Sequence, residues 1–108
     1  MKKIEAYIRP VMLEKVEEAI QLLHICGMSV MEAKGFGKEK EEDYPHHILD
    51  DEVDLIPKTK IEIICEDKDY KKIIDVIKSS AHTGRKGDGN IYVYDVSEAM
   101  SILTGEKL

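Results

Sequence analysis

In the stretch KTKIEIICED, residues 58–67, two sets of side chains alternate: Ile61, Ile63 and Cys65 on one side, and Lys60, Glu62 and Ile64 on the other. The apolar side chains that fall on one side of an extended chain are Ile61, Ile63 and Cys65. This alternation is typical of a β-strand with one buried face. Residues 69–81, DYKKIIDVIKSSA, follow at once with apolar residues at three- and four-residue spacing, which predicts an amphipathic helix. The stretch therefore begins a strand-then-helix unit.

The N-terminal part of the chain repeats this unit. Residues 2–10, KKIEAYIRP, alternate in the same way, and Pro10 ends the predicted strand. Residues 12–27 carry apolar residues at helical spacing with acidic residues between them, and we expect the helix to close near Gly27. A second strand is predicted over SVMEAKGFG, residues 29–37.

Two further elements complete the second half. NIYVYDV, residues 90–96, predicts a fourth strand, and SEAMSIL, residues 97–103, predicts a short terminal helix that Ser97 caps. The polar and acidic residues 38–56 show no periodicity and are expected to form a long loop. The order strand, helix, strand, loop, strand, helix, strand predicts the α+β class and a ferredoxin-like β-α-β-β-α-β fold with an antiparallel sheet.

In this fold both helices cover one face of the sheet. The other face is expected to carry a mixed set of side chains, namely Tyr7, Val30, Glu62 and Tyr92 or their neighbours. One layer of helices leaves such a face uncovered, so we expect the chain to associate with copies of itself.

Length and charge limit the function. The 108 residues are expected to form a single domain, 1–108, and the net charge of −6 argues against a nucleic-acid partner. No apolar run approaches the roughly 20 residues of a membrane span, and the N-terminus lacks the apolar core of a signal peptide. We therefore expect a cytoplasmic protein without membrane insertion. Cys26 and Cys65 lie in apolar patterns and are expected to be buried thiols.

The loop HTGRKGDGNI, residues 82–91, combines three glycines with Arg85 and Lys86. Glycines allow backbone N–H groups to converge, and the two cations supply charge, which suits a phosphate or another anion. The loop matches neither a Walker motif nor a dinucleotide fingerprint, and an ordinary glycine-rich connection is the alternative. KGFGKEK, residues 34–40, is a second glycine-bearing site at a strand end, which favours the anion cradle.

His46 and His47 lie near several aspartates, a suitable set for a transition metal. Side chains of adjacent residues in a strand point to opposite faces, so a solvated loop without metal is the favoured interpretation. No arrangement of nucleophile, base and acid is indicated, and we expect a protein that is not an enzyme.

Taken together, several stretches resemble the PII signal-transduction proteins over essentially the whole chain. They are MKKIEAYIRP (1–10), EAKGFG (32–37), DLIPKTKIEI (54–63), HTGRKGDGNIYV (82–93) and LTGE (103–106). The resemblance implies a PII-like homotrimer with the ferredoxin-like fold. It also implies an adenine nucleotide (ATP, ADP or AMP), with Mg²⁺ as a further candidate, in the clefts between subunits.

The resemblance assigns roles by position. It places Ser29 and Ile64 near the adenine. The groups that would line the cleft or hold the phosphates are Gly35, Gly37, Lys38, Arg85, Gly87, Asp88, Gly89 and Asn90. Glu39 and Lys58 occupy the positions that in the family serve Mg²⁺ or 2-oxoglutarate.

Three segments carry family names. Residues 38–56 match the T-loop, which docks on target proteins, residues 82–90 match the nucleotide-binding B-loop, and residues 97–108 form the C-terminal segment. Family targets include ammonium channels and regulators or enzymes of nitrogen metabolism, so a membrane transporter is among the expected partners. The rival interpretations are a metal-responsive trimer that uses His46 and His47, and a small enzyme that acts on nucleotides.

Several positions depart from the family pattern. Glu39 replaces a glutamine, Asp51 replaces the tyrosine that is uridylylated, and His47 replaces an arginine at the loop tip. Asn90 stands where lysine is usual, and two arginines that reach the partner's phosphates are Ser101 and Leu103 here. Each charge-assisted contact to phosphate is worth on the order of 1.5 to 3 kcal/mol, so we expect the loss of these cations to weaken triphosphate binding. Because Asp51 lacks the tyrosine hydroxyl, we expect no uridylylation at position 51.

Overall fold

Strand β1 (Lys2–Ile8) lies at the centre of the computed structural model, which describes residues 1–25, 27–36 and 55–108. It pairs antiparallel with β3 (Ile56–Cys65) on one side and with β4 (Gly89–Asp95) on the other. Strand β2 (Ser29–Gly35) joins the far edge of β3, so the order of the sheet is β2-β3-β1-β4. The predicted antiparallel sheet is confirmed.

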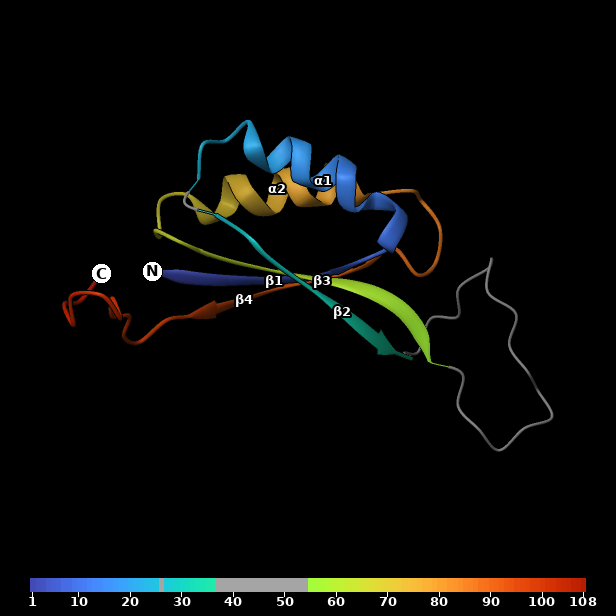
Figure 1. Cartoon of the computed structure of the whole chain (residues 1–108). Helices are drawn as coiled ribbons and strands as arrows, with labels where there is room; N and C mark the ends of the chain where they lie inside the picture. Colours follow the sequence, from blue (N-terminus) through green and yellow to red (C-terminus); the bar gives the residue numbers. More distant parts are fainter. Residues whose placement is uncertain (26, 37–54) are drawn as a thin grey trace.

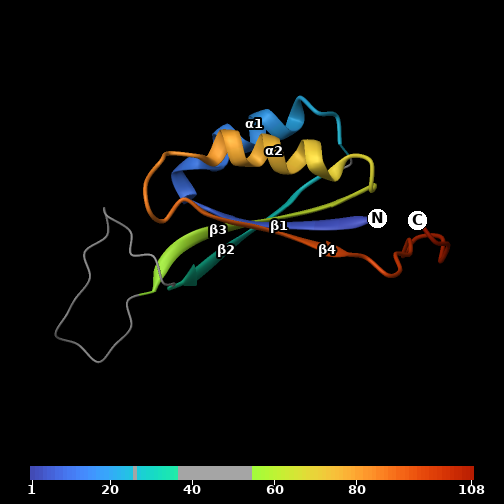
Figure 2. The same ribbon diagram turned by 180° about the vertical axis from the view of Figure 1, so that it is seen from behind.

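Two helices lie on the same face of this sheet (Figures 1 and 2). Helix α1 (Leu13–Gln21) follows a 3-10 turn, η1 (Pro10–Met12), and α2 (Tyr70–Ala81) connects β3 to β4. The order β-α-β-β-α-β matches the predicted ferredoxin-like fold. Neither α1 nor α2, the helices of the described part of the chain, has the length and apolar character that a membrane span requires.

The core lies between the helices and the sheet, where the predicted alternation places it. Ile4 of β1 pairs with Ile63 of β3, and both side chains are at most 1% exposed. Burial of each such side chain contributes about 1.5–3 kcal/mol of transfer free energy, which favours the strand register that brings them together. The other buried side chains of this core cluster are Ala6, Ile8, Val16, Ile20, Ile61, Cys65, Ile73, Ile77 and Ala81.

Helix α1 ends earlier than the sequence predicts, at Gln21 rather than near Gly27. The amide of His24 donates to the carbonyl of Gln21 at 3.2 Å, a tighter i→i+3 bond. His24 itself has φ 53°, in the left-handed region, and a right-handed helix cannot continue through that conformation.

The predicted helix over residues 97–103 is absent, and this prediction was wrong. Met100 instead forms a bridge with Lys107 across a tight turn, in which the amide of Ser101 donates to the carbonyl of Glu106 at 2.9 Å. The segment extends beyond the end of β4 (Figure 1), and Leu103 is 93% exposed. A seven-residue helix is unstable unless its apolar side packs on something, and nothing in the described part of this chain covers it.

The face of the sheet opposite the helices, here called the open face, carries a lattice of four alternating charges. Lys3 lies 3.1 Å from Glu62 and 3.6 Å from Glu5, and Lys60 lies 3.2 Å from Glu62 and 3.7 Å from Glu5. The prediction that this face is mixed in character is therefore confirmed. Tyr7, Glu62 and Tyr92 lie on it as expected.

Val30 is the exception. It pairs with the buried Ile61 and so lies on the helix side of the sheet, where its position at the edge leaves it 44% exposed. Its neighbour Met31 pairs with Lys60 and takes the place on the open face. The prediction for Val30 was off by one residue, because β2 carries apolar side chains at both positions.

Candidate functional site

The candidate site is built around the B-loop, which joins α2 to β4. Its turn needs three residues with positive φ, and glycines fill all three positions: Gly84 (87°), Gly87 (97°) and Gly89 (107°). Gly89 has a further constraint, because β1 passes directly beside it. The spacing of glycines in the sequence is thus explained by the shape of the turn and by the contact with β1.

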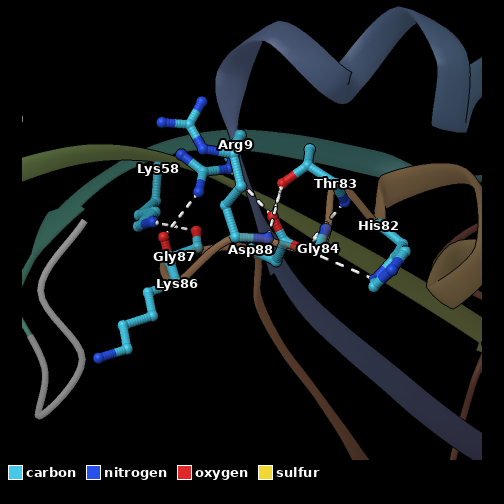
Figure 3. A network of polar contacts seen from close by, with 9 residues as sticks. Arg9, Lys58, His82, Thr83, Gly84, Lys86, Gly87 and Asp88 are labelled. Carbon is cyan, nitrogen blue, oxygen red and sulfur yellow. Dashed lines mark hydrogen bonds and ion pairs between the residues drawn. The ribbon is translucent and has the colours of Figure 1, made fainter. Parts of the chain in front are cut away.

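The carboxylate of Asp88 lies at the centre of the B-loop (Figure 3). Its Oδ2 accepts hydrogen bonds from the amides of Thr83 and Gly84, each at 2.9 Å, and its Oδ1 accepts from Arg9 Nε at 3.1 Å and from the Thr83 hydroxyl. His82 Nδ1 lies 3.6 Å from Oδ2. Burial raises the pKa of the Asp88 carboxyl, but the hydrogen bonds from Thr83, Gly84 and Arg9 outweigh burial and hold this pKa well below its ordinary range.

Two cations from neighbouring strands hold the outer carbonyls of the same loop (Figure 3). Arg9, directly after β1, donates from Nη2 to the carbonyl of Lys86 at 2.7 Å. Lys58 of β3 donates from Nζ to the carbonyl of Gly87 at 2.8 Å. Burial lowers the pKa of the Lys58 ammonium, and the nearby Arg9 lowers it further.

Sequence reasoning missed Arg9 and Thr83 as parts of this site. Arg9 is separated from Asp88 by 79 positions, and only the pairing of β1 with β4 brings them together. Arg9 lies between the alternating residues of the first strand and Pro10, and this position at a strand end is the sequence feature that could have indicated it. Thr83 opens the TGRKGDG motif, and its hydroxyl accepts from the amide of Arg85 at 3.3 Å, which is the bond of a known threonine turn.

The predicted site residues that the structure describes form two separate groups. The first group gathers at the B-loop end of the sheet and comprises Gly35, Lys58, Arg85, Gly87, Asp88, Gly89 and Asn90. The second group, Ser29 and Ile64, lies toward the opposite end, where Ser29 pairs with Glu62 and Ile64 with Lys3. Gly37, Lys38, Glu39, His46 and His47 lie outside the described residues, as does most of the T-loop.

Some members of each group line a concavity, and each of the two concavities has a volume of about 290 Å³. The first is lined by Asp88, Gly89 and Asn90 together with apolar side chains from the end of α2. The second is lined by Ile64 with residues that precede β2 and begin α2. Within the part of the chain that the structure describes, the predicted site residues therefore border two separate concavities rather than one.

The B-loop end carries exposed positive charge. Arg85 and Lys86 are exposed on the turn, where they add positive charge beside backbone amides. Among the residues that the structure describes, no three His, Cys, Asp or Glu side chains come together as a metal site would require. The arrangement is suited to hold an anion.

The fold and the B-loop define the class: a small ferredoxin-like α+β protein with a glycine-rich turn that carries exposed cations at one end of its sheet. The family model "Nitrogen regulatory protein P-II" matches residues 1–106. The chain is 47% identical over 107 residues to nitrogen regulatory protein P-II of Azospirillum brasilense, with 99% of this chain and 96% of that protein covered. It is 45% identical, with the same coverage, to the protein of that name from Rhodospirillum rubrum.

Nitrogen regulatory protein P-II 1 of Escherichia coli K12 is 43% identical over 107 residues, again covering 99% of this chain and 96% of that protein. The chain belongs to the P-II family of nitrogen regulatory signal-transduction proteins. These relatives are named as regulators, which agrees with the expectation that this protein is not an enzyme.

Proposed function

We propose that the protein is a homotrimeric P-II signal transducer that binds an adenine nucleotide between its copies and reports it to a target protein through the T-loop. The observation that supports this most strongly is the separation of the two half-sites. The base half-site, Ser29 and Ile64, and the phosphate half-site, which is the B-loop that Lys58 contacts from behind, lie toward opposite ends of the same sheet.

The separation follows from strand geometry. Ile64 lies six residues beyond Lys58 on β3, which at the rise of an extended strand corresponds to about 20 Å. Two copies placed head to tail bring the base half-site of one against the phosphate half-site of the next. Head-to-tail contacts that close after a few copies form a ring, and a trimer is such a ring.

The open face supports the same assembly. Glu5 is only 9% exposed and accepts a hydrogen bond from the hydroxyl of Tyr7 at 3.0 Å, so the lattice is ordered before any partner arrives. Tyr7 also packs edge-to-face on Tyr92, with ring centroids 6.3 Å apart. The aromatic rings suit this face for contact with a second copy, because tyrosines are enriched where copies meet, and the ion pairs compensate the charges that lie beside them.

The C-terminal segment bears on which nucleotide is preferred. It extends past the end of β4 that is remote from the B-loop (Figure 2), so its residues reach a B-loop only in a neighbouring copy. Ser101 and Leu103 carry no positive charge that could reach the B-loop of a neighbouring copy, and Asn90 adds no positive charge to the B-loop of its own chain. We therefore propose that ADP or AMP binds about as well as ATP, with Mg²⁺ dispensable.

Lys58 and Glu39 bear on the effector of this protein. Of these two residues, the structure describes Lys58, whose ammonium group would bind a dicarboxylate such as 2-oxoglutarate. To do so it would have to break its hydrogen bond to the carbonyl of Gly87. Glu39 would repel that dicarboxylate. The expected target is a protein of nitrogen metabolism or a transporter in the membrane.

Calorimetric titration of the purified chain with ATP, ADP, AMP, 2-oxoglutarate, Mg²⁺ and Zn²⁺ tests this function, together with its mass by sedimentation. We expect a trimer that binds an adenine nucleotide, and Arg85→Ala should weaken binding roughly tenfold, as for one charge-assisted contact. Lys71→Ala, which removes an exposed lysine on α2, is the matched control. A monomer, or a trimer that binds none of the three nucleotides, overturns the proposal.

A further inference from the structure

The side chain of Asp88 is turned into the B-loop instead of toward the surroundings. Its two oxygens accept from four donors of its own chain, which are the amides of Thr83 and Gly84, the Thr83 hydroxyl and Arg9 Nε. The Asp88 side chain is only 22% exposed. A carboxylate so fully engaged has little capacity left for a ligand.

An anionic ligand gains nothing from approaching this carboxylate. Phosphate and carboxylate carry like charges, and the amides of Thr83 and Gly84 that point at Asp88 are already occupied. The donors that meet a phosphate must therefore come from elsewhere in the turn.

The contacts that Arg9 and Lys58 make with two backbone carbonyls of the B-loop indicate which amides are left to meet a phosphate. The carbonyl of Lys86 is directed to Arg9, and the carbonyl of Gly87 is directed to Lys58. These peptide bonds are trans, so the N–H of each unit points opposite to its C=O. The amides of Gly87 and Asp88 consequently point to the side of the turn away from Arg9 and Lys58.

We infer that the Asp88 side chain is a positioning residue, which folds the B-loop through Thr83, Gly84 and Arg9 and thereby fixes the direction of the Gly87 and Asp88 amides. This inference rests on the proposed function, in which amides of the B-loop hold the phosphates. The Asp88 side chain acts through the loop, while the Asp88 backbone amide touches the ligand.

The decisive test is Asp88→Asn, titrated with ADP in the presence of a chelator so that no divalent cation is present. If the carboxylate faced the phosphate, removal of its charge would tighten binding. If the carboxylate shapes the cradle, the loss of one acceptor oxygen weakens binding, roughly tenfold or more. Asp95→Asn makes the same change of charge at the other end of β4, and it should leave the affinity unchanged.

Thr83 provides a second series in the same loop. Thr83→Ser keeps the hydroxyl that donates to Asp88 and should retain ADP affinity. Thr83→Val removes the hydroxyl and should weaken ADP binding in the same direction as Asp88→Asn. Equal affinity for both variants would contradict the positioning role.

Amide exchange measured by NMR without nucleotide separates this inference from the proposed function. In Asp88→Ala, which removes both acceptor oxygens, the Thr83 and Gly84 amides should exchange at least several-fold faster, because each loses its bond to Oδ2. Unchanged exchange of both amides overturns the inference even if the wild-type chain binds ADP. A wild-type chain that ignores ADP overturns the proposed function, while the exchange result still decides the role of Asp88 in the loop.

Discussion

The backbone of Gly89 lies so close to β1 that a Cβ atom at position 89 would stand 1.7 Å from the carbonyl oxygen of Tyr7. Gly89 and Ile8 are paired in the ladder that joins β4 to β1, so this contact is where the B-loop enters the sheet. The position therefore requires glycine for two reasons, the close approach and a φ of 107°.

Gly89→Ala should lower the free energy of unfolding by about 2 kcal/mol or more, since the strain of positive φ and the clash with backbone add together. Gly105→Ala meets no atom within 4 Å but has φ 71°, so it should lower stability by about 1 kcal/mol. Gly35→Ala has neither problem and should have almost no effect. Denaturant unfolding of the three variants checks the order, and a Gly89→Ala chain as stable as Gly35→Ala would refute the account.

The strand and helix order was predictable because it depends on local periodicity. Ile61 and Ile63 alternate with charged residues over a full strand, and no competing pattern occupies that segment. The terminal segment was mispredicted for the converse reason. Met100 and Leu103 do have helical spacing, but a helix of that length is stable only where its apolar side packs against other residues.

The site was predictable in part. The glycines and cations of the B-loop are contiguous in the sequence, and so they are visible without a structure. The inward turn of Asp88 was not visible, because Arg9 reaches it only through the register of β1 and β4. A carboxylate in a phosphate loop is ambiguous until its donors are known.

Lys60→Met tests the open face as a contact between copies. In a free subunit, loss of the two ion pairs from Lys60 to Glu5 and Glu62 should cost little stability, because water can solvate the two carboxylates. In an assembly that excludes water from this face, the two carboxylates are left short of a partner, and the cost should be much larger. Sedimentation should therefore show dissociation of Lys60→Met but not of Lys71→Met, and an intact trimer in both would argue against contact through this face.

The pH dependence of stability should reveal Asp88. Its folded-state pKa lies well below the value of about 3.9 for an unfolded aspartate, so its stabilising contribution is complete above that value and is lost as pH falls through the lowered pKa. The difference in melting temperature between wild type and Asp88→Asn should thus be largest near pH 7 and shrink below about pH 4. Other acidic groups, including Glu62, titrate in both proteins and cancel in the difference. A difference that stays constant down to pH 2 would show that the Asp88 charge does not stabilise the loop.

Mixed assemblies test whether one nucleotide site takes residues from two copies. Ile64→Asp places a charge in the base half-site, and Arg85→Ala weakens the phosphate half-site, so each variant alone should bind ADP poorly. When the two variants are unfolded together and refolded at equal amounts, about a quarter of the clefts should combine an intact Ile64 from one copy with an intact Arg85 from the next. Calorimetry should then show recovery of wild-type affinity at that fraction of sites. A site made within one chain predicts no recovery, because every chain in the mixture carries one of the two defects.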